Sequence, residues 1–124
     1  PCEEDYTDPQ WQQLASSLVH FDSDSAQLTR ASAERLSKVA HLFIESDLFQ
    51  AVSIAGHTDD TGSEAYNLAL SERRTASTAR HLQSQGVLPQ YIEAFHFGEM
   101  LPAKPNTTTE NRAYNRRVHV DLKR

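Results

Sequence analysis

The sequence predicts an α/β fold of two layers, a βαβαβ-(loop)-β arrangement with helices packed on one face of a mixed four-stranded sheet. Two long segments carry apolar residues at helical spacing, which predicts amphipathic helices. Four short segments rich in β-branched and aromatic residues alternate in the way that is typical of strands. Strands and helices that follow one another in this order favour helices layered on a single sheet.

Capping residues delimit the two helices. The first is expected from Thr29, as N-cap, to about Ser46, with one apolar stripe at i, i+3, i+4, i+7 and i+8 that faces the core. The stripe consists of Leu36, Val39, Ala40, Phe43 and Ile44. The second helix is expected to run to Gln85 behind the cap Ser63, with Gly86 as its left-handed stop.

The strands are expected at residues 19–21, 51–55, 92–97 and 118–122. A short docking helix over Gln10–Ser17 is expected before the first strand, and residues 102–111, rich in Pro, Asn and Thr, are typical of a long loop. Further apolar side chains expected in the core are Tyr66, Leu70, Phe95, Phe97 and Trp11. The chain therefore divides into a lead-in over 1–17 and one domain over 18–124.

Composition narrows the function. The chain has 124 residues, enough for one core, and a net charge of −5, which argues against a nucleic-acid binder. No run approaches the roughly 18 apolar residues of a membrane span, so we expect membrane contact only through a region outside this chain or through a lipid anchor. The single cysteine, Cys2, excludes an intramolecular disulfide; we interpret it as a linker residue rather than a lipidated one, because Pro1 precedes it.

Two polar features of the sequence are not explained by the packing of a hydrophobic core. The loop from Gly56 to Gly62 contains Asp59 and follows a strand, and the next helix carries a polar stripe at i, i+4, i+7 and i+11. The stripe consists of Asn67, Ser71, Arg74 and Thr78. Asp59 can accept from an ammonium while Arg74 donates two parallel bonds to a carboxylate, which together would bind the free end of an amino acid. An exposed Asp59–Arg74 salt bridge, contributing less than about 1 kcal/mol, is the other interpretation, and spacing alone leaves both open.

Spaced motifs along most of the chain resemble a known family. They are Phe21-Asp22-Ser23-Asp24-Ser25, Val52-Ser53-Ile54-Ala55-Gly56-His57-Thr58-Asp59, Tyr66-Asn67, Leu70-Ser71 with Arg74, and Asn115-Arg116-Arg117-Val118. In this order they resemble the OmpA C-terminal-like domains, which include the peptidoglycan-associated lipoproteins and the flagellar stator anchors. The sequence departs from the usual pattern at Ser23, Thr75 and Asn111, which stand where an aromatic residue, Ala and Gly are common.

The resemblance implies a non-enzymatic, cofactor-free module of the Gram-negative periplasm, tethered to the outer membrane. It would bind peptidoglycan non-covalently and so anchor an envelope protein to the cell wall. The resemblance assigns the diaminopimelate ammonium to Asp59 and its carboxylate to Arg74. The rest of the same pocket would be lined by Thr58, Asn67, Leu70, Phe21 and Asp24.

Other interpretations remain beside this one. A protein-interaction domain that docks an envelope partner without binding the wall is the main alternative. His57 invites a metal site, but no second ligand stands at suitable spacing, and we expect it to hydrogen-bond the backbone of its turn. Arg116 or Arg117 is expected to pair with a buried acid, with strand alternation sending one inward and the other to solvent.

Overall fold

The computed structural model describes residues 14–22, 25–46, 48–100 and 105–124. Its elements are β1 (Ser16–His20), α2 (Arg30–Glu45), β2 (Ala51–His57), α3 (Glu64–Ser84), the 3₁₀ turn η2 (Pro89–Tyr91), β3 (Ile92–Gly98), α4 (Thr109–Asn115) and β4 (Arg117–Lys123). The two long helices begin where they were predicted: the side chains of Thr29 and Ser63 accept from the amides of Ser32 and Tyr66. Gly86 follows α3 with φ of 106°, as a left-handed stop requires.

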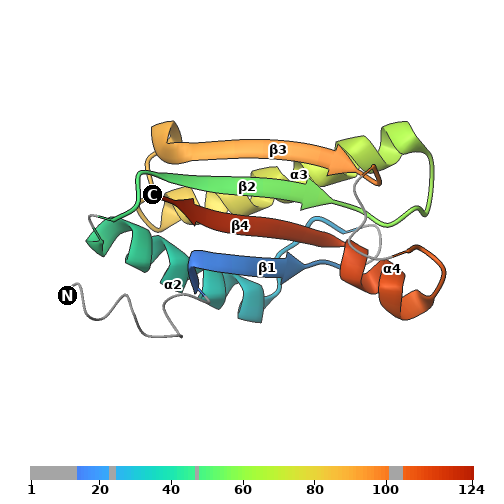
Figure 1. Ribbon diagram of the computed structural model, residues 1–124, viewed down its shortest axis with the longest axis horizontal. Coiled ribbons are helices and arrows are strands. Elements are labelled where there is room, and N and C mark those ends of the chain that lie inside the picture. The colour runs from blue at the N-terminus through green and yellow to red at the C-terminus, as the bar shows by residue number, and fades with distance from the viewer. Residues whose placement is uncertain (1–13, 23–24, 47, 101–104) are drawn as a thin grey trace.

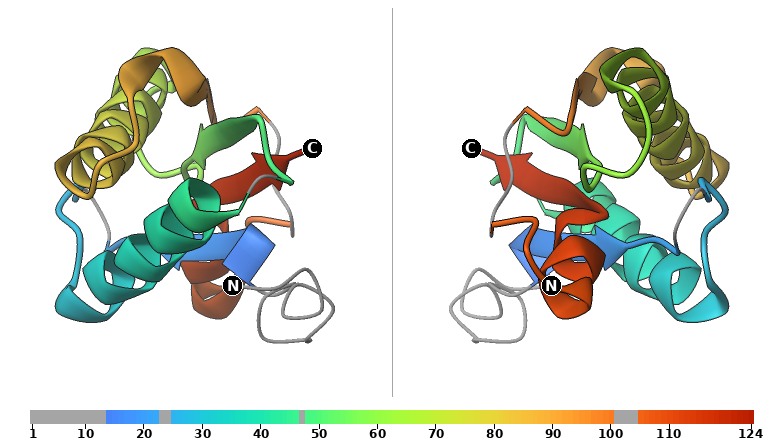
Figure 2. Two further views of the ribbon diagram at one scale, coloured as in Figure 1. Left: turned by 90° about the vertical axis from the view of Figure 1, so that its left-hand side faces the viewer. Right: turned by 90° about the vertical axis from the view of Figure 1, so that its right-hand side faces the viewer.

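The four strands form one mixed sheet in the order β1-β4-β2-β3. β2 and β3 are parallel, and β4 is antiparallel to both β1 and β2. Figures 1 and 2 show α2 and α3 together on one side of the sheet, with α4 at the end where β1 stops and β4 starts. The predicted two-layer arrangement is confirmed, and β1 and β3 form the two edges of the sheet.

The core lies between the sheet and the two long helices. Alternate residues of the central strands face the helices and are fully buried, among them Val52 and Ile54 of β2 and Val118 and Val120 of β4. The helices contribute Leu36, Val39, Ala40, Leu42 and Leu82. This period-two burial explains why the strands were recognisable in the sequence.

The stripe of polar residues on α3 faces the sheet rather than the surface. Asn67, Ser71, Arg74 and Thr78 are all at most 1% exposed. α3 lies close to β2 at Gly56, where a Cβ would lie 2.6 Å from the Ser71 carbonyl oxygen. The burial of this stripe brings the α3 residues of the predicted site against the end of β2.

The structure corrects several expectations. Thr109–Asn115, partly expected as loop, forms α4, capped by Thr108, whose hydroxyl accepts from the Asn111 amide. Arg117 is buried, so neither arginine of the pair is sent to solvent. Ser16 and Ser17 belong to β1, whereas Leu14 and Ala15 of the predicted docking helix are helical; its remaining residues, 10–13, with Trp11, lie outside the described part.

Three apolar side chains expected in the core are exposed: Ile44 by 51%, Tyr66 by 41% and Phe95 by 48%. Phe95 lies on edge strand β3, on the sheet face that α2 and α3 leave uncovered. Alternation alone cannot distinguish the covered face from the open one, so the sequence pattern misplaced this ring.

Replacing Gly56 with alanine tests the close approach of α3 to β2. The added methyl would lie 2.6 Å from both the Ser71 carbonyl oxygen and Thr75 Cγ2. We expect the free energy of unfolding, measured by urea denaturation, to fall by about 1–3 kcal/mol, as in other overpacked cores. Thr75→Ala in the same chain should restore only part of this loss, because the carbonyl belongs to the helix backbone. An unchanged denaturation midpoint in Gly56→Ala would contradict the packing.

Candidate functional site

A cavity of about 400 Å³ lies where the end of β2, the first turns of α3 and the start of β4 meet. Its lining residues are Asp59, Thr61, Gly62, Tyr66, Asn67, Leu70, Arg74 and Arg116. Four of the seven residues predicted for the binding site are therefore in one cavity: Asp59, Asn67, Leu70 and Arg74. Its volume lies within the range of small-molecule sites.

Asp59 is a buried carboxylate, 5% exposed, in the loop that follows β2. Its Oδ1 accepts from the Thr61 amide at 2.9 Å, and its Oδ2 accepts from Arg116 Nη1 at 3.1 Å. A carboxylate has about four acceptor positions, so these two bonds orient the group and leave acceptor capacity on both oxygens. The partner of Asp59 is Arg116 and not Arg74, which excludes an exposed Asp59–Arg74 surface salt bridge.

Arg74 is fully buried and connects three segments of the backbone. Its Nε donates to the Ser25 carbonyl at 2.8 Å, its Nη1 to His57 at 3.0 Å and its Nη2 to Asp22 at 3.0 Å. The guanidinium also lies 5.2 Å from the centroid of the Phe21 ring. Arg74 therefore places a buried positive charge in the cavity and holds the turn after β1 against the end of β2.

The remaining residues predicted for the site lie at different places relative to the cavity. Asn67 is buried in the cavity wall, and its Nδ2 donates to Glu99 Oε1 at 3.0 Å. Thr58 is buried beside the cavity and its hydroxyl donates to the Asp59 carbonyl, so it supports the loop and is not among the lining residues. Phe21 is buried under Arg74 and lines a neighbouring groove. Asp24 lies outside the described residues.

Arg116 belongs to the site and was not included in the predicted set. Its Nε donates to the Phe21 carbonyl at 3.0 Å, and its Nη1 binds Asp59. The prediction that one of the two adjacent arginines pairs with a buried acid is confirmed, because only 7% of the Asp59 side chain is exposed. The signal was present in the sequence as a charged pair at a strand start, but only the fold brings β4 to the β2 loop.

His57 does not behave as the turn histidine that was expected. It is the last residue of β2, and its buried Nδ1 has no hydrogen-bond partner among the described residues. The ring lies 5.4 Å from that of Phe97 and 5.3 Å from that of His119. Burial, together with the charges of Arg117 and then His119, lowers the pKa of His57 to about 4. Across the described ranges no group of three His, Cys, Asp or Glu residues could hold a metal ion.

The family model that matches this chain is that of the OmpA family, over residues 20–116. The chain belongs to the OmpA family. Outer membrane protein A of Bordetella avium is 39% identical over 102 residues, which cover 82% of this chain and 52% of that protein. The peptidoglycan-binding protein ArfA of Mycobacterium tuberculosis is 37% identical over 102 residues, covering 82% of this chain and 31% of that protein.

A solved structure supports the assignment of this OmpA-family domain. The peptidoglycan-associated lipoprotein of Burkholderia pseudomallei is similar with a TM-score of 0.85 and 27% identity, covering 95% of this chain and 98% of that one. By contrast, the chain spans about half the length of the Bordetella relative. Within the described part of this OmpA-family domain, no helix has the length and apolar character needed to cross a membrane.

The buried His57 predicts a loss of stability in acid. The pKa of its side chain is about 4 in the folded protein, against 6.5 for an unperturbed histidine, so the unfolded chain takes up the proton first. Stability from this group is present above pH 6.5 and is lost as the pH falls from about 6.5 to about 4. The pKa values of His20 and His119 are lowered too, mainly by burial, and act in the same direction.

We expect the melting temperature of His57→Phe to fall less steeply than that of the wild type over this pH interval. The control is His41→Phe, whose side chain is 74% exposed on α2 and which should keep the wild-type slope. If the melting temperatures of the wild type and of His57→Phe fall in parallel as the pH is lowered, His57 does not contribute to the acid sensitivity of the fold.

Proposed function

We propose that this domain binds peptidoglycan through the diaminopimelate residue of the stem peptide and so anchors an envelope protein to the cell wall. The observation that carries the proposal is a cavity that Asp59 and Arg74 both line, with neither group paired to the other in the described contacts. Two relatives support it by name, the peptidoglycan-binding protein ArfA and the peptidoglycan-associated lipoprotein. We place its action in the periplasm, with the tether to the outer membrane supplied by a region outside this chain or by a lipid anchor.

The ligand chemistry follows from the charges. The free end of diaminopimelate carries an ammonium and a carboxylate on one carbon, which makes it a compact zwitterion. Asp59 is the acceptor for the ammonium, and its carboxylate is already oriented by the Thr61 amide and Arg116. Arg74 and Arg116 supply positive charge for the carboxylate, and charge-assisted bonds of this kind contribute roughly 1.5–3 kcal/mol each.

The buried position of Arg74 modifies the role expected for it. A guanidinium has five N–H donors, and three of the Arg74 donors bind backbone carbonyls. The main role of Arg74 is therefore to place a fixed positive charge in the wall of the cavity, and direct hydrogen bonding to the ligand is its secondary role. Its replacement by alanine would leave three backbone carbonyls, one of them buried, without their donor, so a loss of binding in that variant would not separate ligand contact from folding.

Asp59→Asn is the sharper test of the site. The amide keeps the size of the side chain but removes the charge, and we expect binding to purified sacculi, measured by co-sedimentation, to fall by roughly tenfold to a hundredfold. The matched control is Asp60→Asn. Asp60 is the adjacent carboxylate, and it forms an exposed pair with Arg112 at 3.0 Å.

The Asp60→Asn variant should sediment like the wild type, since exposed pairs contribute little. Both variants should melt within a few degrees of the wild type, measured in the same buffer. If Asp59→Asn sediments with sacculi as the wild type does, the cavity is not the binding site.

Competition by small molecules tests the diaminopimelate assignment. Nα-acetyl-lysine amide ends in a side-chain ammonium, but its α-amino and α-carboxyl groups are blocked, so it offers Asp59 a partner and leaves the positive charges of the cavity unmatched. We expect diaminopimelate to displace the domain from sacculi at concentrations at least about tenfold lower than Nα-acetyl-lysine amide, because one charge-assisted bond is lost. Equal displacement by the two compounds would refute the specificity while leaving wall binding intact.

A further inference from the structure

The outer edge of β1 carries backbone groups that pair with no described strand. Among the described strands, β1 is terminal in the sheet and pairs with β4 alone. The Phe21 amide donates to the Arg116 carbonyl at 2.9 Å, which fixes the phase of the antiparallel ladder. Because donors and acceptors alternate in such a ladder, Val19 and Ser17 also face β4, and the N–H and C=O groups of Leu18 and His20 face outward.

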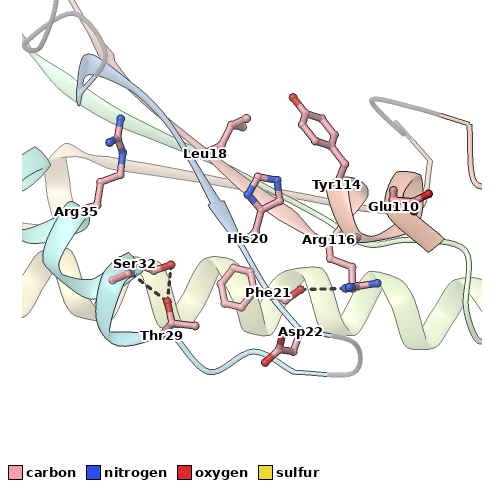
Figure 3. Close-up of a pocket in the computed structure, with 12 residues that line it drawn as sticks. Leu18, His20, Phe21, Asp22, Thr29, Ser32, Arg35, Glu110, Tyr114 and Arg116 are labelled. Carbon is pink, nitrogen blue, oxygen red and sulfur yellow. Dashed lines mark hydrogen bonds between the residues drawn. The ribbon is translucent and has the colours of Figure 1, made fainter. Parts of the chain in front are cut away.

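This edge forms the floor of a groove with a volume of about 640 Å³. Leu18, His20 and Phe21 line it from β1, and two helices form its walls. The wall residues are Thr29, Ala31, Ser32 and Arg35 of α2 and its cap, and Glu110, Ala113 and Tyr114 of α4. The strand edge is therefore recessed between two walls (Figure 3).

The two ends of the groove differ in charge. At the start of β1, Arg35 Nε donates to Ser17 Oγ at 3.2 Å, which places the guanidinium at that end. Asp22 follows the end of β1, and Glu110 lies on the α4 wall beside Arg116, whose guanidinium is already paired with Asp59, so the other end is acidic on balance. Between the two ends, Leu18, Tyr114 and Ala113 offer apolar contacts.

We propose that the β1 edge is a docking groove for a short extended segment of a partner protein, added to the sheet as an antiparallel strand. The main-chain groups of Leu18 and His20 provide hydrogen bonds to such a segment, and the walls select its side chains. Since β1 runs from the cationic end to the acidic end, an antiparallel segment begins with a basic residue near Glu110 and ends with an acidic residue near Arg35. This proposal does not depend on the wall-binding function, because its floor and walls share only Arg116 with the diaminopimelate cavity.

The shape of the groove favours a single slender segment over a second copy of the domain. For two copies to pair edge to edge, the β1 strands would have to meet, but each lies between α2 and α4. β1 is also only five residues long, which limits it to pairing with a short segment. Short edge strands of this kind resist open-ended sheet growth while still accepting a peptide.

The probe is an acetylated and amidated peptide, Lys-Val-Thr-Val-Glu, titrated into the ¹⁵N-labelled protein. We expect the amides of Leu18 and His20 to become protected from hydrogen exchange, while the Val19 amide, already in the ladder, changes little. The reversed peptide, Glu-Val-Thr-Val-Lys, should bind at least about tenfold more weakly, because its charges then match only a parallel strand. Equal binding of the two peptides overturns the assigned polarity.

Two N-methylated forms of the first peptide, modified on alternate amides, test the added strand without changing the protein. In an added strand, every second peptide amide points toward β1 and the others point to solvent. The form methylated on the solvent-facing amides should therefore bind like the parent peptide, and the form methylated on the amides that face β1 should not bind. Binding by both forms, or by neither, overturns the proposal. Protection of the Leu18 and His20 amides before any peptide is added overturns it too, because the edge would then already be occupied.

Leu18→Pro removes the outward N–H on the protein side, at an edge position where proline is tolerated, and Leu18→Val is its matched control. We expect Leu18→Pro to lose peptide binding by at least about tenfold while Leu18→Val retains it. Leu18→Pro should also sediment with sacculi as the wild type does, which shows that it is folded and separates this groove from the wall-binding site. Retained peptide binding in Leu18→Pro, or a dimer in the wild type that Leu18→Pro abolishes, overturns the proposal.

Discussion

The arrangement of this domain depends on the buried guanidinium of Arg74. Its three bonds to backbone carbonyls join α3 to the turn after β1 and to the end of β2, segments that are up to 52 residues distant in the chain. A charge that is fully buried is tolerated only where its donors are matched by acceptors, and the carbonyls supply that match. The same group that assembles the site thus also determines the electrostatic character of its cavity.

The site combines one buried acid and two arginines in a single cavity. Asp59 is held by Arg116 and by the Thr61 amide, while Arg74 approaches the cavity from α3. An excess of positive charge beside an oriented carboxylate suits a ligand that carries both charges on neighbouring groups. Because the cavity is largely shielded from solvent, its interactions are screened by salt less than those of an exposed ion pair.

The helices cover only one face of the sheet, which leaves its other face and the β1 edge available as a second surface. α2 and α3 bury one face, so polar and aromatic residues such as His119 and Phe95 occupy the other, and β1 and β3 remain as edges. At β1 the helices α2 and α4 turn that edge into a groove instead of a flat rim. The two proposed recognition surfaces meet at Arg116, which lines both, and Arg74 of the cavity also contacts Phe21 and Asp22 of the groove, so these contacts connect the two surfaces.

The sequence by itself determined the two long helices, the four strands and the placement of Asp59 and Arg74 beside one another, because periodicity, capping residues and local motifs are encoded over short distances. It did not determine that α3 turns its polar stripe inward, that Arg116 rather than Arg74 pairs with Asp59, or that α4 forms after the loop. Those outcomes depend on which face of the sheet the helices cover and on a contact between residues 59 and 116. Only tertiary packing brings such distant residues together, since no local pattern records which of several arginines will reach a given acid.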